Sequence, residues 1–262
     1  MTERFHHIEI EINTVCDVNC PACDRYCDTA PGPNMTHKQI AMLVLESVEL
    51  KWPWTRIHVL GGEPTLHPQF EQIMVTLMAL RGRLLREYRD EDCLLRVLTN
   101  GRGKLAEYHH WLVENEVHVA ISPKDPARMP DYWDNMWTAP VDVTPDIQPA
   151  CSIFGIKGCG IGLTRHGYFL CGAGASIARV AGLDIGVQRL EDLTWEAMQA
   201  QAEVLCRLCA HKEGYHEKLR NTGPVKGPFW AKALEAWKAG SNPPMTIYGE
   251  RAAYESRDET ME

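Results

Sequence analysis

Segments with the pattern of strands alternate with segments with the pattern of helices along the first 150 residues, and this order restricts the fold most. Strands are expected where polar and apolar residues alternate, and helices where apolar residues recur every three or four positions. The predicted strands are 8–14, 56–62, 94–101, 117–124 and 140–145. The predicted helices in this part are 37–50, capped by Thr36, 68–80 and 104–116. Alternating strands and helices form βαβ units, so we expect an α/β fold with a parallel sheet.

The predicted strands carry polar residues at every second position, whereas strands of a doubly wound sheet are almost continuously apolar. In the first strand Glu9 and Glu11 alternate with isoleucines, and His58 and His118 lie on the polar side of later strands. One face should therefore pack on helices while the other meets something polar. We expect a partial (β/α)6 TIM-like barrel whose lumen holds a polar ligand. Edge strands that face water are the alternative.

The composition changes after residue 150. Residues 155–176 are rich in glycine and cysteine, and helices are predicted at 190–205 and 228–239. From Ser241 the chain has two adjacent prolines, scattered charges and no periodicity, as expected of a flexible tail. The predicted organisation is a barrel core at 1–148, a small Cys-rich domain at 149–240 and a flexible tail at 241–262.

Composition limits the compartment and the partners. The N-terminus has no apolar core of a signal peptide, and no apolar run reaches the length of a membrane span, so we expect a cytoplasmic protein without a membrane partner. Ten cysteines in such a compartment favour metal ligands or catalytic groups over disulfides. A net charge of −8 argues weakly against a nucleic-acid-binding module, although a nucleic-acid substrate is not excluded.

Three cysteines, Cys16, Cys20 and Cys23, follow the first predicted strand in the stretch CDVNCPAC. In a β/α barrel the loops after the strands form the active-site face. Thiolates are the usual ligands of iron–sulfur clusters. Three of them can hold three irons of a 4Fe-4S cluster and leave the fourth iron open to another ligand.

The CxxxCxxC spacing, together with GGEP at 61–64 and LTNG at 98–101, resembles the radical S-adenosylmethionine (SAM) superfamily over about the first 150 residues. The resemblance implies that SAM chelates the open iron of the 4Fe-4S cluster through its amino and carboxylate groups. Reductive cleavage of SAM would give a 5′-deoxyadenosyl radical that abstracts hydrogen from the substrate. The cofactors carry this chemistry, and the protein supplies position and a dry cavity.

The resemblance also implies residues that contact SAM. Glu63 would accept from the ammonium group of SAM, while the two glycines before it let the backbone come close. Asn100 and Ser122 are candidates for ribose or carboxylate contacts, with turn capping as the alternative. Lys124 would bind a substrate carboxylate or be a solvated cap. The expected cofactor-binding residues are Gly61, Gly62, Glu63, Pro64, Thr99, Asn100, Ser122 and Lys124.

The sequence departs from the family at Ala22, where an aromatic residue often precedes the last cysteine. This leaves the usual adenine contact open, and Tyr26 is a candidate to replace it. Cys27 is a further thiol in the same loop and is interpreted as structural or solvent-facing. Cys93 lies in a predicted strand and is expected to be a packed thiol.

A second set of cysteines resembles the twitch domain, a shortened SPASM domain with an auxiliary 4Fe-4S cluster. The expected ligands are Cys151, Cys171, Cys206 and Cys209, with Cys159 as the alternative to Cys151. Three residues separate Gly167 from Cys171 in the stretch GYFLC, whereas the family pattern has four. A structural zinc on four cysteines is the alternative.

Four further residues are candidates for the substrate site or for ordinary packing. Trp133 and Trp137 form a lid or a packed loop, and Arg165 and His166 face substrate or water. No catalytic side chain is identified from the sequence.

We therefore expect a radical SAM enzyme that acts on a polar small molecule, a nucleoside-like or an amino-acid-bearing substrate, giving oxidation or rearrangement. A flavodoxin or ferredoxin would supply electrons. The alternatives are an enzyme like 7-carboxy-7-deazaguanine synthase, a peptide-modifying radical SAM enzyme, and a non-enzymatic iron–sulfur or zinc sensor.

Overall fold

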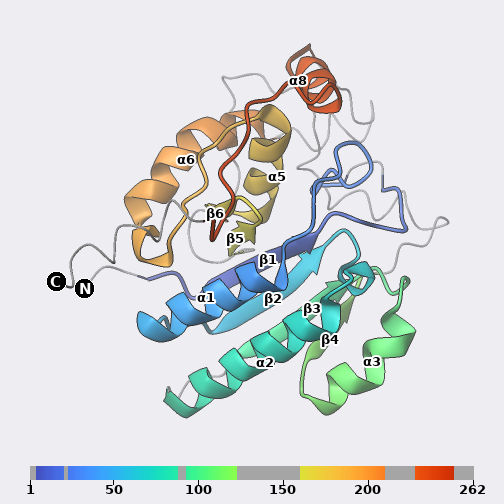
Figure 1. Ribbon diagram of the computed structural model, residues 1–262, viewed down its shortest axis with the longest axis vertical. Helices are drawn as coiled ribbons and strands as arrows, with labels where there is room; N and C mark the ends of the chain where they lie inside the picture. Colours follow the sequence, from blue (N-terminus) through green and yellow to red (C-terminus); the bar gives the residue numbers. More distant parts are fainter. Residues whose placement is uncertain (1–3, 21–22, 88–92, 123–159, 210–227, 251–262) are drawn as a thin grey trace, which may run out of the picture.

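A six-stranded sheet forms the centre of the computed structural model (Figure 1). The structure describes residues 4–20, 23–87, 93–122, 160–209 and 228–250. The strands are β1 His7–Asn13, β2 Arg56–Gly61, β3 Leu94–Thr99, β4 His118–Ile121, β5 Ile161–Thr164 and β6 Gly167–Phe169. Their order is β4-β3-β2-β1-β5-β6, with parallel neighbours except for the antiparallel pair β5–β6. The predicted α/β class and the first four strands are confirmed, whereas 140–145 lies outside the described residues.

Five helices of the described residues lie close to where the sequence predicts them, whereas the helix Gly172–Ala181 was not predicted. The described helices are α1 His37–Glu49, α2 Phe70–Glu87, α3 Leu105–Glu114, α5 Gly172–Ala181, α6 Trp195–Leu208 and α8 Pro228–Lys238, with 3-10 turns η1 Pro64–Leu66 and η4 Leu190–Asp192. Thr36 caps α1 with a complete capping box, as the sequence predicts. The α2 helix passes its predicted end at residue 80, because Leu84 is buried against the core.

The apolar face of the sheet is covered by helices of the same βαβ units. Ile8, Ile10 and Ile12 of β1 have no exposed surface, and α1 and α2 lie along the sheet in Figure 1. Burying an isoleucine side chain contributes about 1.5–3 kcal/mol. This alternation therefore fixes which face of β1 turns inward.

The polar face of β1 meets groups of the same chain. Arg25 donates to Glu9 at 2.8 Å, and Ser176 of α5 donates to Glu11 at 3.4 Å. Both carboxylates are only 6% exposed, and burial raises the pKa of each despite the nearby arginines. The expectation that this face is open to a polar ligand is therefore wrong along the middle of β1, where α5 and Arg25 cover it.

Residues predicted to belong to the Cys-rich domain continue the sheet of the predicted barrel core. β5 pairs with β1 in the same sheet, with Ile8 opposite Ile161 and Ile10 opposite Leu163. The segment after residue 160 therefore extends the sheet of the first 122 residues. The boundary itself, at 148–149, lies outside the described residues.

The flexible tail expected from Ser241 is also wrong for its first ten residues. Tyr248 is 1% exposed, and its hydroxyl donates to Glu46 of α1 at 2.5 Å. Thr246 bonds to Asp184 through both its backbone N–H, at 2.9 Å, and its hydroxyl, at 2.8 Å. Polar anchors of this kind have no periodicity, so the sequence pattern did not show them.

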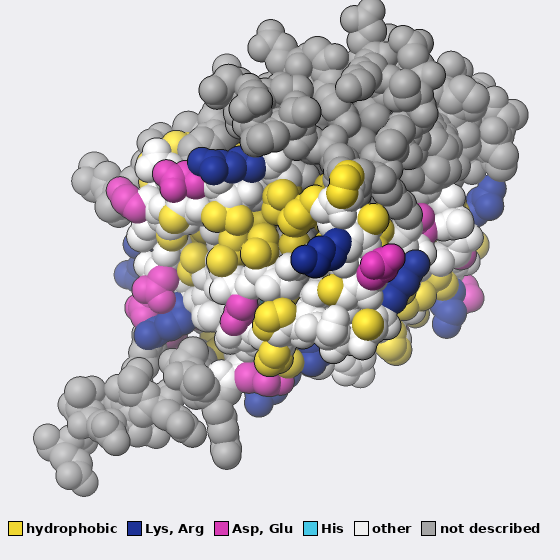
Figure 2. All heavy atoms as spheres, turned by 90° about the horizontal axis from the view of Figure 1, so that it is seen from above, with side chains coloured by type: hydrophobic (Ala, Val, Ile, Leu, Met, Phe, Trp, Pro, Cys, Tyr) yellow, Lys and Arg dark blue, Asp and Glu magenta, His cyan; other side chains and the backbone are white. Residues whose placement is uncertain are grey.

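The surface of the described part is mixed. Figure 2 shows one face, where hydrophobic side chains gather and Lys and Arg are scattered among Asp and Glu. No helix within the described ranges is both long and apolar enough to cross a membrane.

The buried ring of His58, which lies against His7, should make the protein sensitive to acid. Nε2 of His7 lies 2.9 Å from Nδ1 of His58, and burial lowers the pKa of His58 to about 3. Between that value and its usual 6.5 the unfolded chain binds the extra proton, so this residue's contribution to stability is lost as pH falls through that window. Lowering the pH from 7.5 to 5 should reduce the unfolding free energy of both proteins. The reduction should be about 1 kcal/mol smaller in His58→Gln than in wild type.

Urea unfolding at the two pH values measures this difference. His110→Gln is the matched control, since the His110 side chain is 87% exposed. Equal pH dependence in His58→Gln and wild type would contradict the assignment.

Candidate active site

The loop that leaves β1 carries the first three candidate cysteines. β1 ends at Asn13, so Cys16 lies three residues beyond the carboxyl end of the strand. Cys20 is buried, Cys16 and Cys23 are partly buried, and none of the three is in a disulfide. The Cys23 N–H donates to the Cys20 carbonyl at 3.2 Å. The loop therefore presents three reduced thiols at the edge of the sheet where βα loops gather.

The thiols are not closed around a common point. Within the described ranges, no three His, Cys, Asp or Glu residues gather closely enough to hold a metal ion. Cys23 instead interacts with Cys27, and this hydrogen bond is the main reason that the pKa of Cys23 is lowered. Cys27, expected to be structural or solvent-facing, is thus a direct neighbour of a candidate ligand.

Asp17 and Asn100 tie the cysteine loop to the loop after β3. The Asn100 amide donates to Asp17 at 2.7 Å and approaches the Cys16 sulfur at 3.8 Å. The second Asp17 oxygen accepts from the Gly103 N–H at 2.9 Å, and the Asn100 side-chain oxygen accepts from the Arg102 N–H at 2.7 Å. The side chain of Asn100, a candidate contact for SAM, therefore contacts the loop that carries Cys16. Asp17 was not among the predicted site residues, because a single Asp within a loop carries no spacing signal.

Glu63 lies at the centre of a buried hydrogen-bond network. Its side chain has no exposed surface, and its carboxylate accepts from the Thr65 hydroxyl at 2.7 Å and the Thr65 N–H at 3.2 Å. It also accepts from the Thr99 hydroxyl at 2.8–2.9 Å and the Asn100 N–H at 2.8 Å. The Glu63 oxygens, which were expected to accept from the ammonium group of SAM, therefore already accept hydrogen bonds from this chain. Glu63 therefore joins the loops after β2 and β3.

The two glycines before Glu63 make room for the cysteine loop. A Cβ on Gly61 would lie 2.2 Å from the Asn13 carbonyl oxygen, and one on Gly62 would lie 2.3 Å from the Val15 carbonyl oxygen. In the same place the Gly62 N–H donates to Asn13 at 2.9 Å and the Glu63 N–H to Val15 at 2.8 Å. The close approach that requires glycine is therefore between two segments of this chain.

The remaining candidates for SAM binding lie near this network. Pro64 begins the 3-10 turn η1, and Thr99 is 3% exposed with its hydroxyl on Glu63. The Ser122 N–H donates to the Thr99 carbonyl at 2.8 Å, which places Ser122 beside the same loop. Lys124 lies outside the described residues, as do Trp133 and Trp137.

Tyr26 does not present its ring to a ligand. It has no exposed surface, and its ring packs edge-on against Trp230 of α8 with centroids 5.7 Å apart. Burial raises the pKa of its hydroxyl well above the usual value, and Cys209 is the next cause, with Cys23 a smaller one. The ring therefore lies close to both sets of cysteines, in the core instead of over an adenine.

The described members of the second cysteine set lie at helix ends and pack against the core. Cys171 caps α5, with its sulfur accepting from the Gly174 N–H at 3.2 Å. Cys206 is in the last turn of α6, and Cys209 is its C-cap. A Cβ on Gly174 would lie 3.4 Å from the Cys171 sulfur and 3.3 Å from Leu205, so Cys171 faces the end of α6. Cys151 and Cys159 lie outside the described residues.

Cys93 is a packed thiol, as expected. It is 8% exposed, and burial raises its pKa to about 11. A thiol in this state is a poor nucleophile.

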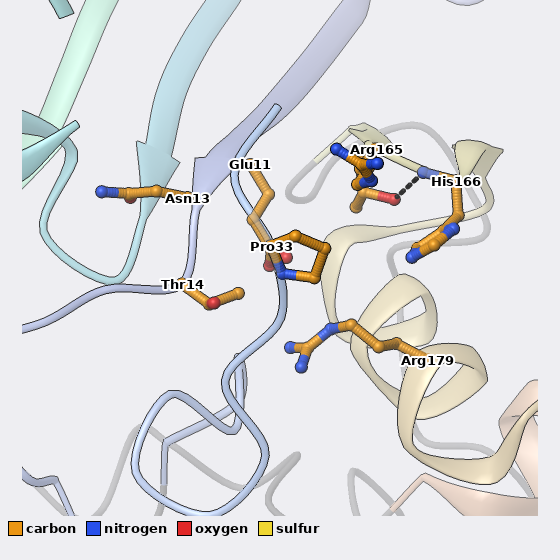
Figure 3. A pocket seen from close by; sticks show the side chains of 8 residues that line it. Glu11, Asn13, Thr14, Pro33, Arg165, His166 and Arg179 are labelled. Atoms are coloured by element: carbon orange, nitrogen blue, oxygen red, sulfur yellow. Dashed lines mark hydrogen bonds between the residues drawn. The ribbon is translucent and has the colours of Figure 1, made fainter. Parts of the chain in front are cut away.

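A pocket opens beside the cysteine loop, at the carboxyl ends of β1 and β5 (Figure 3). Its lining residues are Glu11, Asn13, Thr14, Pro33, Thr164, Arg165, His166 and Arg179. Arg165 and His166, which were expected to face either substrate or water, both line this pocket.

The parallel strands, with candidate ligands and a pocket at their carboxyl ends, define an α/β enzyme whose site is built from βα loops. The family described as "Radical SAM superfamily" matches residues 10–143, just over half of the chain. The chain therefore belongs to the radical SAM superfamily. Members of this superfamily use a 4Fe-4S cluster, SAM, a reductant and a substrate.

One solved structure supports the same fold. The crystal structure of BtrN in complex with AdoMet and 2-DOIA matches with a TM-score of 0.53 and 13% sequence identity, over 82% of this chain and 95% of BtrN. At this identity the likeness concerns the fold alone. No curated protein matches this sequence.

Proposed function

We propose that Cys16, Cys20 and Cys23 hold the 4Fe-4S cluster that binds SAM. The observation that carries this proposal is the loop after β1, which bears three cysteines outside any disulfide, with Asp17 and Asn100 holding the first of them beside the loop after β3. Three thiolates suit three irons of a cluster and leave one iron for SAM.

The residues around this loop would shape the SAM site by position. Glu63 fixes the loops after β2 and β3, and Gly61 and Gly62 let the cysteine loop lie against them. SAM would then meet backbone groups of the GGEP segment, with Thr99, Asn100, Ser122 and Lys124 around it. When bound, the cluster and SAM supply a 5′-deoxyadenosyl radical, and the protein orients the substrate and excludes water.

We also propose an auxiliary 4Fe-4S cluster on Cys171, Cys206 and Cys209, with Cys151 or Cys159 as the fourth ligand. Support comes from the position of Cys171 facing the end of α6 and from the likeness to BtrN. A second cluster could accept an electron from a substrate radical, so we propose oxidation of a polar small molecule as the reaction, with rearrangement as the alternative. Flavodoxin or ferredoxin would be the electron donor, and the protein would act in the cytoplasm.

An anaerobic comparison tests both clusters. The reconstituted protein and Cys16→Ala/Cys20→Ala/Cys23→Ala are assayed for iron, sulfide and 5′-deoxyadenosine formed from SAM with dithionite. We expect about eight irons in wild type, about four in the triple variant and no deoxyadenosine from the variant. Cys93→Ala is the matched control, because it removes a buried thiol without changing a proposed ligand.

Two results would contradict the proposal. Deoxyadenosine formation that survives in the triple variant would exclude these cysteines as ligands of the first cluster. About four irons with full activity in wild type would exclude the auxiliary cluster and favour structural zinc on the second set.

A further inference from the structure

The pocket at the carboxyl ends of β1 and β5 has an excess of positive charge. The pocket is small and partly open to solvent. Figure 3 shows Arg165 and Arg179 on opposite sides of this space, with Glu11 and Pro33 between them. Glu11 is the one acidic residue in the lining, against two arginines. The pocket therefore has a net charge of at least +1.

Arg179 is fixed in place by the chain itself. Its guanidinium donates to the carbonyls of Ala30 and, at 2.7 Å, of Arg25. These acceptors are neutral, and Glu11 is the acidic residue that faces Arg179 in the lining of the pocket. Because burial raises the pKa of Glu11, its negative charge is costly there, which weakens its opposition to an anion.

Arg165 has most of its donors to spare. Its guanidinium makes one long hydrogen bond, 3.3 Å, to the Asn34 carbonyl, and the described part of the chain offers it no carboxylate within ion-pair distance. Its backbone is held in place, since the Arg165 carbonyl accepts from Gln39 at 3.2 Å and from the Tyr248 N–H at 2.9 Å. A planar guanidinium on a fixed backbone, with no carboxylate partner in the described residues, can donate two hydrogen bonds to a carboxylate or a phosphate.

Thr164 and His166 add groups that recognise hydroxyls. The Thr164 hydroxyl accepts from the His166 N–H at 3.1 Å, so its own proton remains to be donated. Nδ1 of His166 lies 3.1 Å from the Thr246 carbonyl and must donate to it. Burial lowers the pKa of His166, so the ring is neutral and its Nε2 is an acceptor.

We propose that this pocket binds a hydroxylated small molecule through its phosphate or carboxylate group, with the anion on Arg165 and Arg179 and hydroxyls on Thr164 and His166. The inference rests on the proposed function, because it makes the bound molecule the substrate of the enzyme. Thr14 lines the pocket and lies two residues before Cys16, so the anion would hold the substrate next to the cysteine loop.

Equilibrium dialysis on the anaerobically reconstituted holoprotein tests this site. The probes are inorganic phosphate, glycerol 3-phosphate, glycerate and glycerol, used at low ionic strength. We expect glycerol 3-phosphate or glycerate to bind at least tenfold more tightly than glycerol. Arg165→Gln should lower the affinity for the tighter-binding of these two anions at least tenfold. The preferred anion distinguishes a phosphate ligand from a carboxylate ligand.

The controls separate this inference from the proposed function. Arg83→Gln changes a surface arginine, 46% exposed in its side chain, and should leave every affinity unchanged. Melting temperature and SAM binding are measured in parallel and should be equal in Arg165→Gln and wild type. Failure of all three anions to bind, or equal anion affinity in Arg165→Gln and wild type, would overturn the site. Neither result depends on deoxyadenosine formation, which tests the proposed function by itself.

Discussion

Gly62→Ala should destabilise the protein by about 3 kcal/mol and lower the iron content of the first cluster. The new Cβ would lie 2.3 Å from the Val15 carbonyl oxygen and 2.8 Å from the Thr14 carbonyl oxygen. Both atoms are backbone, so no side chain can rotate to relieve the overlap. The cysteine loop would have to move away from β2, and Cys16 follows Val15 directly.

Urea unfolding and iron analysis of the reconstituted protein measure the two effects. Gly82→Ala is the matched control: Gly82 lies within α2, and its new Cβ would come no closer than 3.7 Å to the Arg86 side chain. Alanine in the interior of a helix should stabilise the protein by about 0.5–1 kcal/mol. Two opposite signs from one kind of substitution would show that the backbone contact is responsible. Wild-type stability and iron content in Gly62→Ala would refute the close approach.

The sequence predicted the elements better than their connections. Periodicity found the first four strands and five of the described helices, but not α5, because it reports which side of a segment is buried and α5 is buried almost all round. It could not show that β5 pairs with β1, since pairing partners 153 residues apart leave no local pattern. Burial of Tyr248 on Glu46 was invisible for the same reason, because a tyrosine in an aperiodic segment looks like part of a tail.

The same limit applies to the candidate site: its motif is visible in the sequence, but its contacts are not. The glycines and Glu63 stand out by their motif, but the motif does not tell whether they touch a ligand or another segment. The partners of Glu63 are Thr99 and Asn100, 36 and 37 residues further along the chain. Their contact depends on the pairing of β2 with β3, in which Val59 lies opposite Val97. The sequence therefore predicts where the site lies, and the packing of its loops decides what each residue does there.

Glu63→Gln should cost about 2–3 kcal/mol of stability, because the buried amide group would face donors that the carboxylate now accepts. Thr99 and Asn100 both donate to Oε2, and Thr65 and Thr99 donate to Oε1, so either orientation of the glutamine turns an NH2 group toward a donor. Thr99→Val removes one donor and leaves the carboxylate with the others. It should cost about 1 kcal/mol.

Comparing the stability of these variants with their affinity for SAM distinguishes the two roles of Glu63. If Glu63 positions the loops, Glu63→Gln and Thr99→Val should both lower the unfolding free energy, and their effects should not add, because the two side chains contact each other. If the carboxylate instead binds the ammonium group of SAM, Glu63→Gln should weaken SAM binding with little change in stability, and Thr99→Val should be without effect on it. Since the protein donors already fill both oxygens, we expect the first pattern in urea unfolding and in equilibrium dialysis with SAM.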